Sequence, residues 1–254
     1  MSRNKWLVLA LCALPVLAGC GGGEKEEASS EAPASDASAT AAVDTANAGG
    51  VSGAVSYAGA DTDTPIAMNA DPVCAGLHST PVDTNEIAVN GGKLANVFVY
   101  VKSGLEGKNF PAPTEKKELD QVGCQYTPRV QGLQVGQPIS IKNTDATLHN
   151  VHALPTQNQE FNQAQPQGLP PFDKTFDKQE VMVHVKCDVH PWMTAYIGVL
   201  PHPYYAVSGE DGSFKIDKLP PGKYTIEAWH EKLGTKTQEV TIAANQQATL
   251  DFAF

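Results

Sequence analysis

The sequence lacks an excess of basic side chains, a long apolar run and a large number of cysteines. Its 254 residues include 18 Lys and Arg against 28 Asp and Glu, so the formal net charge is −10. A nucleic-acid-binding protein needs a basic surface, and this balance argues against nucleic acid as a partner. No apolar run reaches the roughly 20 residues that a membrane-spanning helix requires. The five cysteines are too few for a disulfide-packed small protein and have to be considered one by one.

The sequence also lacks the residue patterns that would indicate a catalytic site. It contains no Ser/His/Asp nucleophile arrangement, no suitably spaced pair of acids and no glycine-rich phosphate-binding loop. We therefore predict that the protein is not an enzyme.

The first 19 residues are typical of a bacterial signal peptide. Arg3 and Lys5 precede an apolar segment, residues 6–18, which is too short to span a bilayer but suits a signal-peptide core. The sequence Leu17-Ala18-Gly19-Cys20 resembles the lipobox of bacterial lipoproteins. This resemblance implies cleavage before Cys20 and acylation of that cysteine. An ordinary signal peptide with an incidental cysteine is the alternative.

Residues 20–50 are expected to form a flexible tether. They are mostly Gly, Ala, Ser, Thr, Glu and Asp, and such a segment cannot bury enough apolar surface to fold. In Gram-negative lipoproteins an aspartate after the acylated cysteine favours the inner membrane, so Gly21 favours the outer membrane. The protein is thus predicted to be lipid-anchored in the bacterial cell envelope and to face the periplasm.

From Val51 onward the sequence is typical of an all-β protein. Short runs of β-branched and aromatic residues alternate with turn signals such as Asp211-Gly212 and Pro220-Pro221-Gly222. No helical periodicity extends beyond two turns. We predict a protein of β-sandwich type. The expected strands are 51–57, 94–101, 137–142, 181–187, 196–200, 213–216, 223–229, 239–242 and 248–252.

Two segments of this region, residues 143–152 and 181–193, contain closely spaced potential metal ligands. The second includes a Cys-x-x-His-x-x-Met loop, which can supply three ligands to one ion while a separate strand end supplies the fourth. A thiolate, two imidazoles and a weak axial thioether suit copper that cycles between two oxidation states. Zinc would prefer a harder fourth ligand than a methionine. The candidate ligands of this loop are Cys187, His190 and Met193.

These segments resemble cupredoxins of the amicyanin type. Cys187-x-x-His190-Pro191-x-Met193 is similar to their ligand loop, and Leu148-His149-Asn150-Val151-His152 is similar to their upstream ligand segment. The resemblance covers about residues 117–201. It implies one type 1-like copper ion held by His149, Cys187 and His190, with Met193 as axial ligand. It also implies that Asn150 connects the two ligand loops by hydrogen bonds.

A second resemblance is to carboxypeptidase regulatory-like domains, which are transthyretin-type β-sandwiches. Residues 211–226 are similar to the second half of such a domain. Gly53-Ala54-Val55 and residues 95–101 are similar to the first half. We therefore predict one sandwich from 51–110 plus 203–254, with a Greek-key cupredoxin domain, 111–202, inserted in it or packed beside it. A generic β-extension with a Pro-Gly turn is the alternative.

The remaining cysteines and histidines receive simpler interpretations. With Cys187 on the metal, Cys74 and Cys124 are the pair left to form a disulfide in an oxidising compartment; two free buried thiols are the alternative. His152 is expected outside the ligand set, and alternation along its strand predicts an exposed His184. Trp192 could assist electron exchange or simply pack at the rim of the site. No role is predicted for His78, His202 and His230.

Together these inferences predict a lipid-anchored periplasmic copper protein that transfers single electrons. Its partner would be a redox protein such as a cytochrome or a membrane oxidoreductase, and it would contact the membrane through Cys20. The seven histidines show no pattern for the second copper centre that a copper oxidase or nitrite reductase needs. The alternatives are a copper-handling protein and a structural or ligand-binding envelope lipoprotein.

Overall fold

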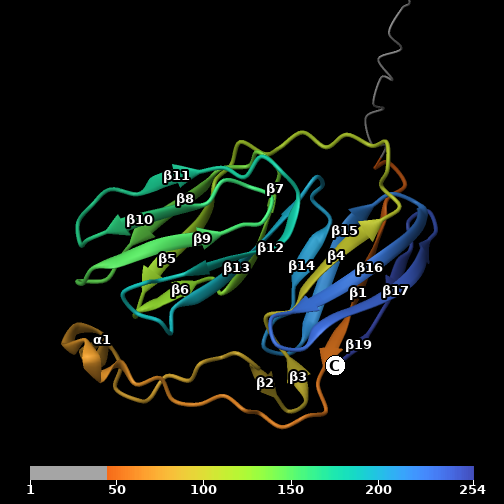
Figure 1. Cartoon of the computed structure of the whole chain (residues 1–254). Helices are drawn as coiled ribbons and strands as arrows, with labels where there is room; N and C mark the ends of the chain where they lie inside the picture. Colours follow the sequence, from red (N-terminus) through yellow and green to blue (C-terminus); the bar gives the residue numbers. More distant parts are fainter. Residues whose placement is uncertain (1–44) are drawn as a thin grey trace, which may run out of the picture. The chain divides into compact units, whose positions relative to one another are not determined.

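The computed structural model describes residues 45–254. The predicted signal peptide, the acylated Cys20 and most of the expected tether lie outside the described residues. The described chain consists of strands β1 to β19, one short 3-10 helix and one short α-helix (Figure 1), so the all-β prediction is confirmed. None of the helices in this range has the length and apolar character needed to cross a membrane.

The first sandwich combines strands from both ends of the described chain. Its first sheet has the order β15-β1-β3-β2, and β18 and β19 also pair with β1. These strands are β1 (Gly49–Ser56), β2 (Val89–Asn90), β3 (Lys93–Leu94), β15 (Ser213–Leu219), β18 (Gln247–Thr249) and β19 (Phe252–Ala253). β1 begins at Gly49, inside the segment expected as tether. Because β1 runs antiparallel to β15, with Val51 opposite Ile216, the sheet needs both ends of the chain.

The second sheet of this sandwich has the order β14-β4-β16-β17. Its strands are β4 (Phe98–Ser103), β14 (Tyr205–Val207), β16 (Gly222–His230) and β17 (Gly234–Ile242). Between the two sheets lies an apolar core that includes Val51, Val99, Ile226 and Phe252. Apolar residues alternate along β16, and this pattern buries one of its faces against the core.

The second sandwich lies between β4 and β14 in the sequence. Its five-stranded sheet has the order β10-β9-β12-β13-β7, and its four-stranded sheet has the order β11-β8-β5-β6. The first contains β7 (Val130–Gln134), β9 (His149–Leu154), β10 (Phe161–Gln165), β12 (Glu180–Lys186) and β13 (Thr194–Leu200). The second contains β5 (Lys117–Val122), β6 (Gln125–Thr127), β8 (Ile139–Asn143) and β11 (Phe172–Lys174). Cys187 and Met193 belong to the apolar core of this sandwich.

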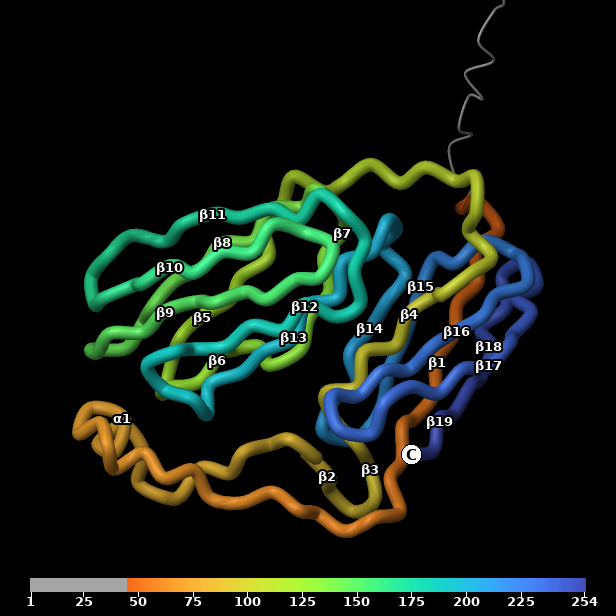
Figure 2. Tube along the Cα trace, viewed as in Figure 1, coloured from red at the N-terminus to blue at the C-terminus, as the bar shows by residue number. Residues whose placement is uncertain are grey.

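A long connection joins β1 to β2 and contains the two helices. The helices are η1 (Met68–Ala70) and α1 (Pro72–Leu77). Figure 2 shows the chain leaving β1, passing through α1 and returning to β2 and β3. Asp71 caps α1, because its Oδ1 accepts hydrogen bonds from the backbone N–H groups of Val73 (2.7 Å) and Cys74 (3.2 Å). A disulfide between Cys74 and Cys124 ties α1 to the β5–β6 loop.

A third apolar cluster joins the two sandwiches. It includes Phe98 of the first sandwich and Val130 and Leu200 of the second. Beside it, Arg129 donates from Nε and Nη2 to the two carboxylate oxygens of Glu231, at 2.6 and 3.0 Å. The side chains of this ion pair are only 14% and 4% exposed. The second sandwich is therefore attached to the first by packing and by a buried charge pair.

His184 lies at this junction and is half-buried, so the prediction of an exposed side chain is wrong. Alternation does place it on the strand face opposite the core, but the first sandwich lies against that face. The ring of His184 stacks on Tyr196, which in turn contacts Trp229 of β16, with centroid distances of 5.1 and 5.0 Å. Its Nε2 lies 2.8 Å from Oγ1 of Thr194.

Candidate metal centre

Three of the candidate ligands meet at one end of the second sandwich. His149 is the first residue of β9, Cys187 directly follows β12, and His190 lies in the turn from β12 to β13. Because β9 and β12 are antiparallel neighbours, with His152 opposite Lys186, the start of one strand lies beside the end of the other. One donor atom from each of the three side chains lies within 4.8 Å of the other two. All three residues are buried, at 0%, 2% and 3% exposure.

Met193 completes the turn that carries Cys187 and His190. The backbone N–H of Cys187 donates to the carbonyl of Met193 (3.2 Å), and the N–H of Met193 donates to the carbonyl of His190 (3.0 Å). The Met193 side chain is 1% exposed and packs in the same core as Cys187. The turn thus keeps Met193 near the cluster, and its role as an axial ligand stays a prediction.

Two carboxylates orient the imidazole rings. His149 Nε2 lies 2.9 Å from Asp145 Oδ2, and His190 Nε2 lies 3.0 Å from Asp71 Oδ2. The Nδ1 atoms of the two rings face one another at 2.8 Å. A carboxylate that accepts the Nε2 hydrogen of an imidazole leaves Nδ1 free to bind a metal.

Sequence reasoning missed both carboxylates. Asp145 had a signal, since it lies four residues before His149 in the segment that carries that ligand. Asp71 had none, because 119 residues separate it from His190.

Charge within the cluster shifts the pKa values of His149 and Cys187 in opposite directions. Burial by itself lowers the pKa of His149, but the Asp145 carboxylate and the Cys187 sulfur raise it to about 9. Burial raises the pKa of the Cys187 thiol, but hydrogen bonding from His149 and from backbone N–H groups lowers it overall. One of these donors is the N–H of His190, 3.4 Å from Sγ. Deprotonation to the thiolate, the form that binds metals, is therefore easier than for an unperturbed thiol.

Asn150 connects the two ligand-bearing segments. Its Oδ1 accepts hydrogen bonds from the backbone N–H of Asp188 (2.7 Å) and from Sγ of Cys187 (3.3 Å). Asp188 Oδ2 accepts a hydrogen bond from Asn150 Nδ2 at 3.1 Å. His152 lies outside the donor cluster, with its Nδ1 2.9 Å from Asp188 Oδ2 and its Nε2 3.0 Å from Glu160 Oε1. These contacts hold the β9 segment against the turn after β12.

The donor set fits a copper ion. It offers two imidazole nitrogens and a thiol of lowered pKa, all buried, with a thioether on the same turn. Two further groups among residues 45–254 have metal-binding side chains close together, Asp71/Cys74/His190 and Cys124/Asp145/His149. Neither provides a thiolate, because Cys74 and Cys124 are joined in the disulfide. Cys187 is the free cysteine of the described chain.

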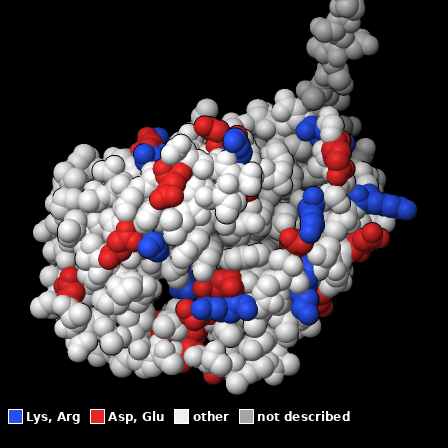
Figure 3. Space-filling view, viewed as in Figure 1, with Lys and Arg blue, Asp and Glu red and all other residues white. Residues whose placement is uncertain are grey.

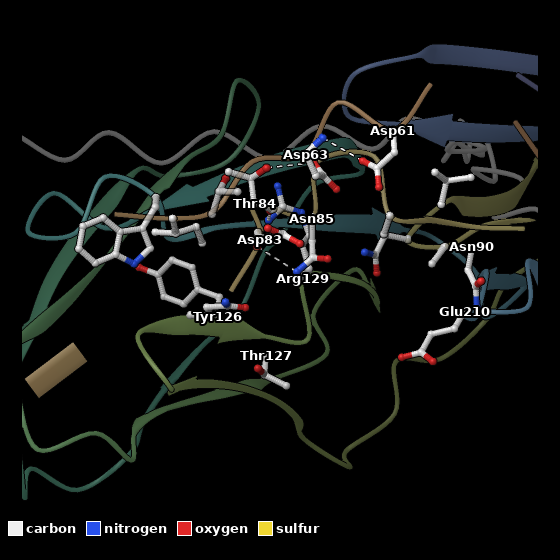
Figure 4. Close-up of a pocket in the computed structure, with 18 of the residues that line it drawn as sticks. Asp61, Asp63, Asp83, Thr84, Asn85, Asn90, Tyr126, Thr127, Arg129 and Glu210 are labelled. Atoms are coloured by element: carbon white, nitrogen blue, oxygen red, sulfur yellow. Dashed lines mark hydrogen bonds between the residues drawn. The ribbon is translucent and has the colours of Figure 1, made fainter. Parts of the chain in front are cut away.

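A polar pocket of about 700 Å³ adjoins the metal centre, with Trp192 and Met193 among its lining residues. The Trp192 ring packs against the His190 ring at a centroid distance of 5.1 Å. Figure 4 shows Asp63, Thr84 and Arg129 among the polar groups that line this pocket. Asp63 Oδ1 already accepts hydrogen bonds from Thr84 and from two backbone N–H groups, and Arg129 is paired with Glu231. Asp63 and Arg129 therefore stabilise the fold through these contacts.

Comparisons with known proteins agree with parts of this architecture. A family model for the carboxypeptidase regulatory-like domain matches residues 194–254, which contain β13 and the strands β14 to β19 of the first sandwich. No match was found among the curated proteins.

The solved structures that resemble the chain include cupredoxins and a copper enzyme. A purple cupredoxin from Nitrosopumilus maritimus is 19% identical over 33% of this chain and 98% of its own, with a TM-score of 0.28. A reduced amicyanin variant is 19% identical over 40% of this chain and 97% of its own, with a TM-score of 0.30. A copper-containing nitrite reductase from Thermus scotoductus SA-01 is 20% identical over 57% of this chain and 28% of its own, with a TM-score of 0.30.

Proposed function

We propose that the protein binds one copper ion through His149, Cys187 and His190, with Met193 as a weak axial ligand, and carries single electrons. The observation that supports this most is the convergence of two oriented imidazoles and one thiol of lowered pKa in a buried site. Copper in such a site changes its oxidation state by one electron. The chain itself contributes donors held in place by Asp145, Asp71 and Asn150. Such a site transfers an electron and makes no bonds, so we propose no enzymatic reaction.

Apolar side chains beside the centre suit a short-lived contact with a redox partner. Leu148 and Val189, the neighbours of His149 and His190 in the sequence, are 44% and 46% exposed. Transient electron-transfer complexes bury only small contact surfaces, so a few exposed side chains beside the centre can form one. On the face shown in Figure 3, basic and acidic side chains lie interspersed rather than in separate patches. We propose a cytochrome or a membrane oxidoreductase as the partner.

We further propose that acylation of Cys20 anchors the protein in the cell envelope, facing the periplasm. The tether would then hold the copper centre close to membrane-bound partners and raise its local concentration. Cys20→Ser should move the protein to the soluble fraction and leave its copper spectrum unchanged. A variant that remains with the membranes would contradict the lipid anchor.

The test of copper binding is a Cu(II) titration of the purified protein followed by its visible spectrum. We expect one equivalent of copper to produce an intense thiolate-to-copper band. Cys187→Ser should remove that band entirely, since the bond from copper to sulfur is lost. A full band in Cys187→Ser would contradict the assignment. The absence of any band in the unmodified protein would favour a structural or ligand-binding envelope lipoprotein.

A second measurement separates an electron carrier from a copper-handling protein. The copper-loaded protein is mixed with a reduced cytochrome, and both the electron exchange and the bound copper are measured. We expect reversible exchange with copper retained in both oxidation states. Release of the copper once it has been reduced would favour copper handling.

A further inference from the structure

Residues 66–78, which we name the cap segment, lie outside both sandwiches and are fastened to the metal-binding end of the second one. The Cys74–Cys124 disulfide attaches the segment to the β5–β6 loop, and His78 Nε2 lies 2.8 Å from the carbonyl oxygen of Gly123. Met68 packs with this disulfide in a small apolar cluster that Trp192 also contacts. The cap segment therefore has a defined position over the turn that carries His190.

Asp71 uses its two carboxylate oxygens for different partners. Oδ1 accepts the backbone N–H groups that begin α1. Oδ2 lies 3.0 Å from His190 Nε2 and accepts a hydrogen bond of 3.0 Å from Thr147 Oγ1. One oxygen thus caps a helix, whereas the other faces a predicted metal ligand.

This arrangement closes the edge of the His190 ring that faces away from His149. Nδ1 faces the other imidazole, while Nε2 meets Asp71 and lies 3.7 Å from Sγ of Cys74. The Trp192 ring packs on the imidazole, and His190 is only 3% exposed. Both ring nitrogens therefore have partners, and solvent has little access to the ring.

The disulfide also links the two carboxylates that orient the imidazoles. Asp145 accepts hydrogen bonds from the backbone N–H groups of Gly123 (2.8 Å) and Cys124 (2.7 Å), in addition to its contact with His149. Asp71 lies three residues before Cys74, the other half of the disulfide. A continuous set of contacts thus runs from His149 through Asp145, the disulfide and Asp71 to His190.

We propose that Asp71 is a positioning residue of the metal centre. It holds the His190 ring with Nδ1 directed at the ion, and the cap segment closes the outer edge of that ring to solvent and to redox partners. The inference rests on the proposed copper function and assigns part of the centre to a segment outside the second sandwich. The cap segment leaves the exposed side of the centre, at Leu148 and Val189, available for contact with a redox partner.

Three substitutions separate positioning of His190 from helix capping. Asp71→Ser keeps a good N-cap residue for α1 but is too short to reach the imidazole. Asp71→Ala removes both contacts, and Asp71→Asn keeps one oxygen acceptor of similar reach, replaces the other by an N–H donor and removes the charge. Asp173→Asn is the control for a lost charge, because Asp173 pairs with Lys116 on the exposed surface.

We expect Asp71→Ser and Asp71→Ala to weaken Cu(II) binding about 10- to 100-fold, as loss of a carboxylate behind a metal-bound histidine commonly does. Their copper midpoint potentials should rise, because a negative charge that stabilises the oxidised ion is gone. Asp71→Asn keeps only one of the two oxygen acceptors, so it should show the higher potential with a loss of affinity no larger than that of Asp71→Ala. Asp173→Asn should match the unmodified protein. If Asp71→Ser behaves like the unmodified protein while Asp71→Ala is impaired, Asp71 only caps α1 and the proposal is wrong.

A second readout uses the metal-free protein, so it does not depend on copper. Diethyl pyrocarbonate modifies accessible imidazole nitrogens, and peptide mass spectrometry reports which histidine has reacted. His190 should be protected in the unmodified protein and should react at least several-fold faster in Asp71→Ser. Equal protection of His190 in both proteins would contradict the proposal that Asp71 and the cap segment close the edge of this ring. If the unmodified protein binds no copper, the proposed function fails, whereas the labelling still decides whether Asp71 shields His190.

Discussion

Each of the two sandwiches contains a cluster of polar side chains, and the two clusters are organised differently. In the first sandwich the Glu227 carboxylate accepts hydrogen bonds from Tyr100 (2.5 Å), Lys102 (2.5 Å) and Thr237 (3.1 Å). In the second, donor atoms of His149, His190 and Cys187 converge within 4.8 Å of one another. A polar cluster whose members satisfy each other stabilises a fold, whereas donor atoms that converge on one point suit an ion.

The buried histidines show the same contrast. His202 and His230 are buried in the first sandwich without an acidic partner in hydrogen-bonding contact, and burial lowers the pKa of each to about 4. In the second sandwich the neighbouring Asp145 and Cys187 raise the pKa of His149 to about 9 despite its burial. The first sandwich thus keeps these two histidines neutral, whereas the second places negative charge beside His149.

The largest expected effect tests whether the two sandwiches depend on each other. Arg129→Met removes the partner of Glu231, whose side chain is 4% exposed, and leaves a buried charge unpaired. We expect a loss of about 3–5 kcal/mol in the free energy of unfolding. Denaturant unfolding followed by tryptophan fluorescence, with the copper band as a second signal, measures it. If the copper band persists after the rest of the protein has unfolded, the second sandwich is independent of the first.

The next effect concerns acid stability and sharpens the contrast between the histidines. The unfolded chain protonates these side chains below pH 6.5, whereas the folded chain protonates His202 and His230 only near pH 4. Stability is therefore lost as the pH falls through this window, by roughly 1.5 kcal/mol per histidine between pH 6.5 and 5. The pH slope of the unfolding free energy reports how many protons the chain takes up on unfolding. His202→Gln should reduce that number by up to one. An unchanged slope would show that His202 takes up its proton over the same pH range in the folded and the unfolded chain.

A smaller effect tests whether Met193 serves the site or only the core. Met193→Leu conserves volume, so it should cost less than about 1.5 kcal/mol of stability. It should also retain the copper band and raise the midpoint potential, because an axial thioether is lost. Spectroelectrochemical titration measures the potential. A potential equal to that of the unmodified protein would show that Met193 only packs.

The smallest effect is expected at an exposed ion pair of the second sandwich. Lys116 and Asp173 lie 2.6 Å apart, with side chains about half exposed. Lys116→Ala should change the unfolding free energy by no more than about 1 kcal/mol, because exposed pairs gain little over their hydrated state. It is the matched control for Arg129→Met. A loss as large as that of Arg129→Met would mean that burial does not distinguish the two pairs.

Strands with strong β-branched patterns could be predicted, whereas hydrophilic strands could not. β12 and β16 lie close to their expected positions because apolar residues alternate along them. The sequence of β5 is Lys-Glu-Leu-Asp-Gln-Val, and only Leu119 and Gln121 are buried. β10 and β11 are similarly polar and short. Such strands form because neighbouring strands offer backbone hydrogen bonds, which is not visible in their own composition.

The candidate ligands could be found from sequence because most of them lie close together in the chain, on a single turn. Cys187, His190 and Met193 lie within seven residues, and a single turn brings them together. Asn150 and Asp145 flank His149 in the same segment, although only Asn150 was singled out. The sequence also determined the β-rich composition and the acidic net charge, since both are sums over residues.

Only the tertiary structure decided which distant segments complete the centre. The contact between Asp71 and His190 spans 119 positions, and it exists because the Cys74–Cys124 disulfide holds α1 over the turn. Likewise, alternation along β12 places His184 on the face that points away from the core of the second sandwich. His184 is nevertheless half-buried, because the first sandwich covers that face. Periodicity reports which face of a strand a residue occupies, but whether that face meets solvent depends on what folds against it.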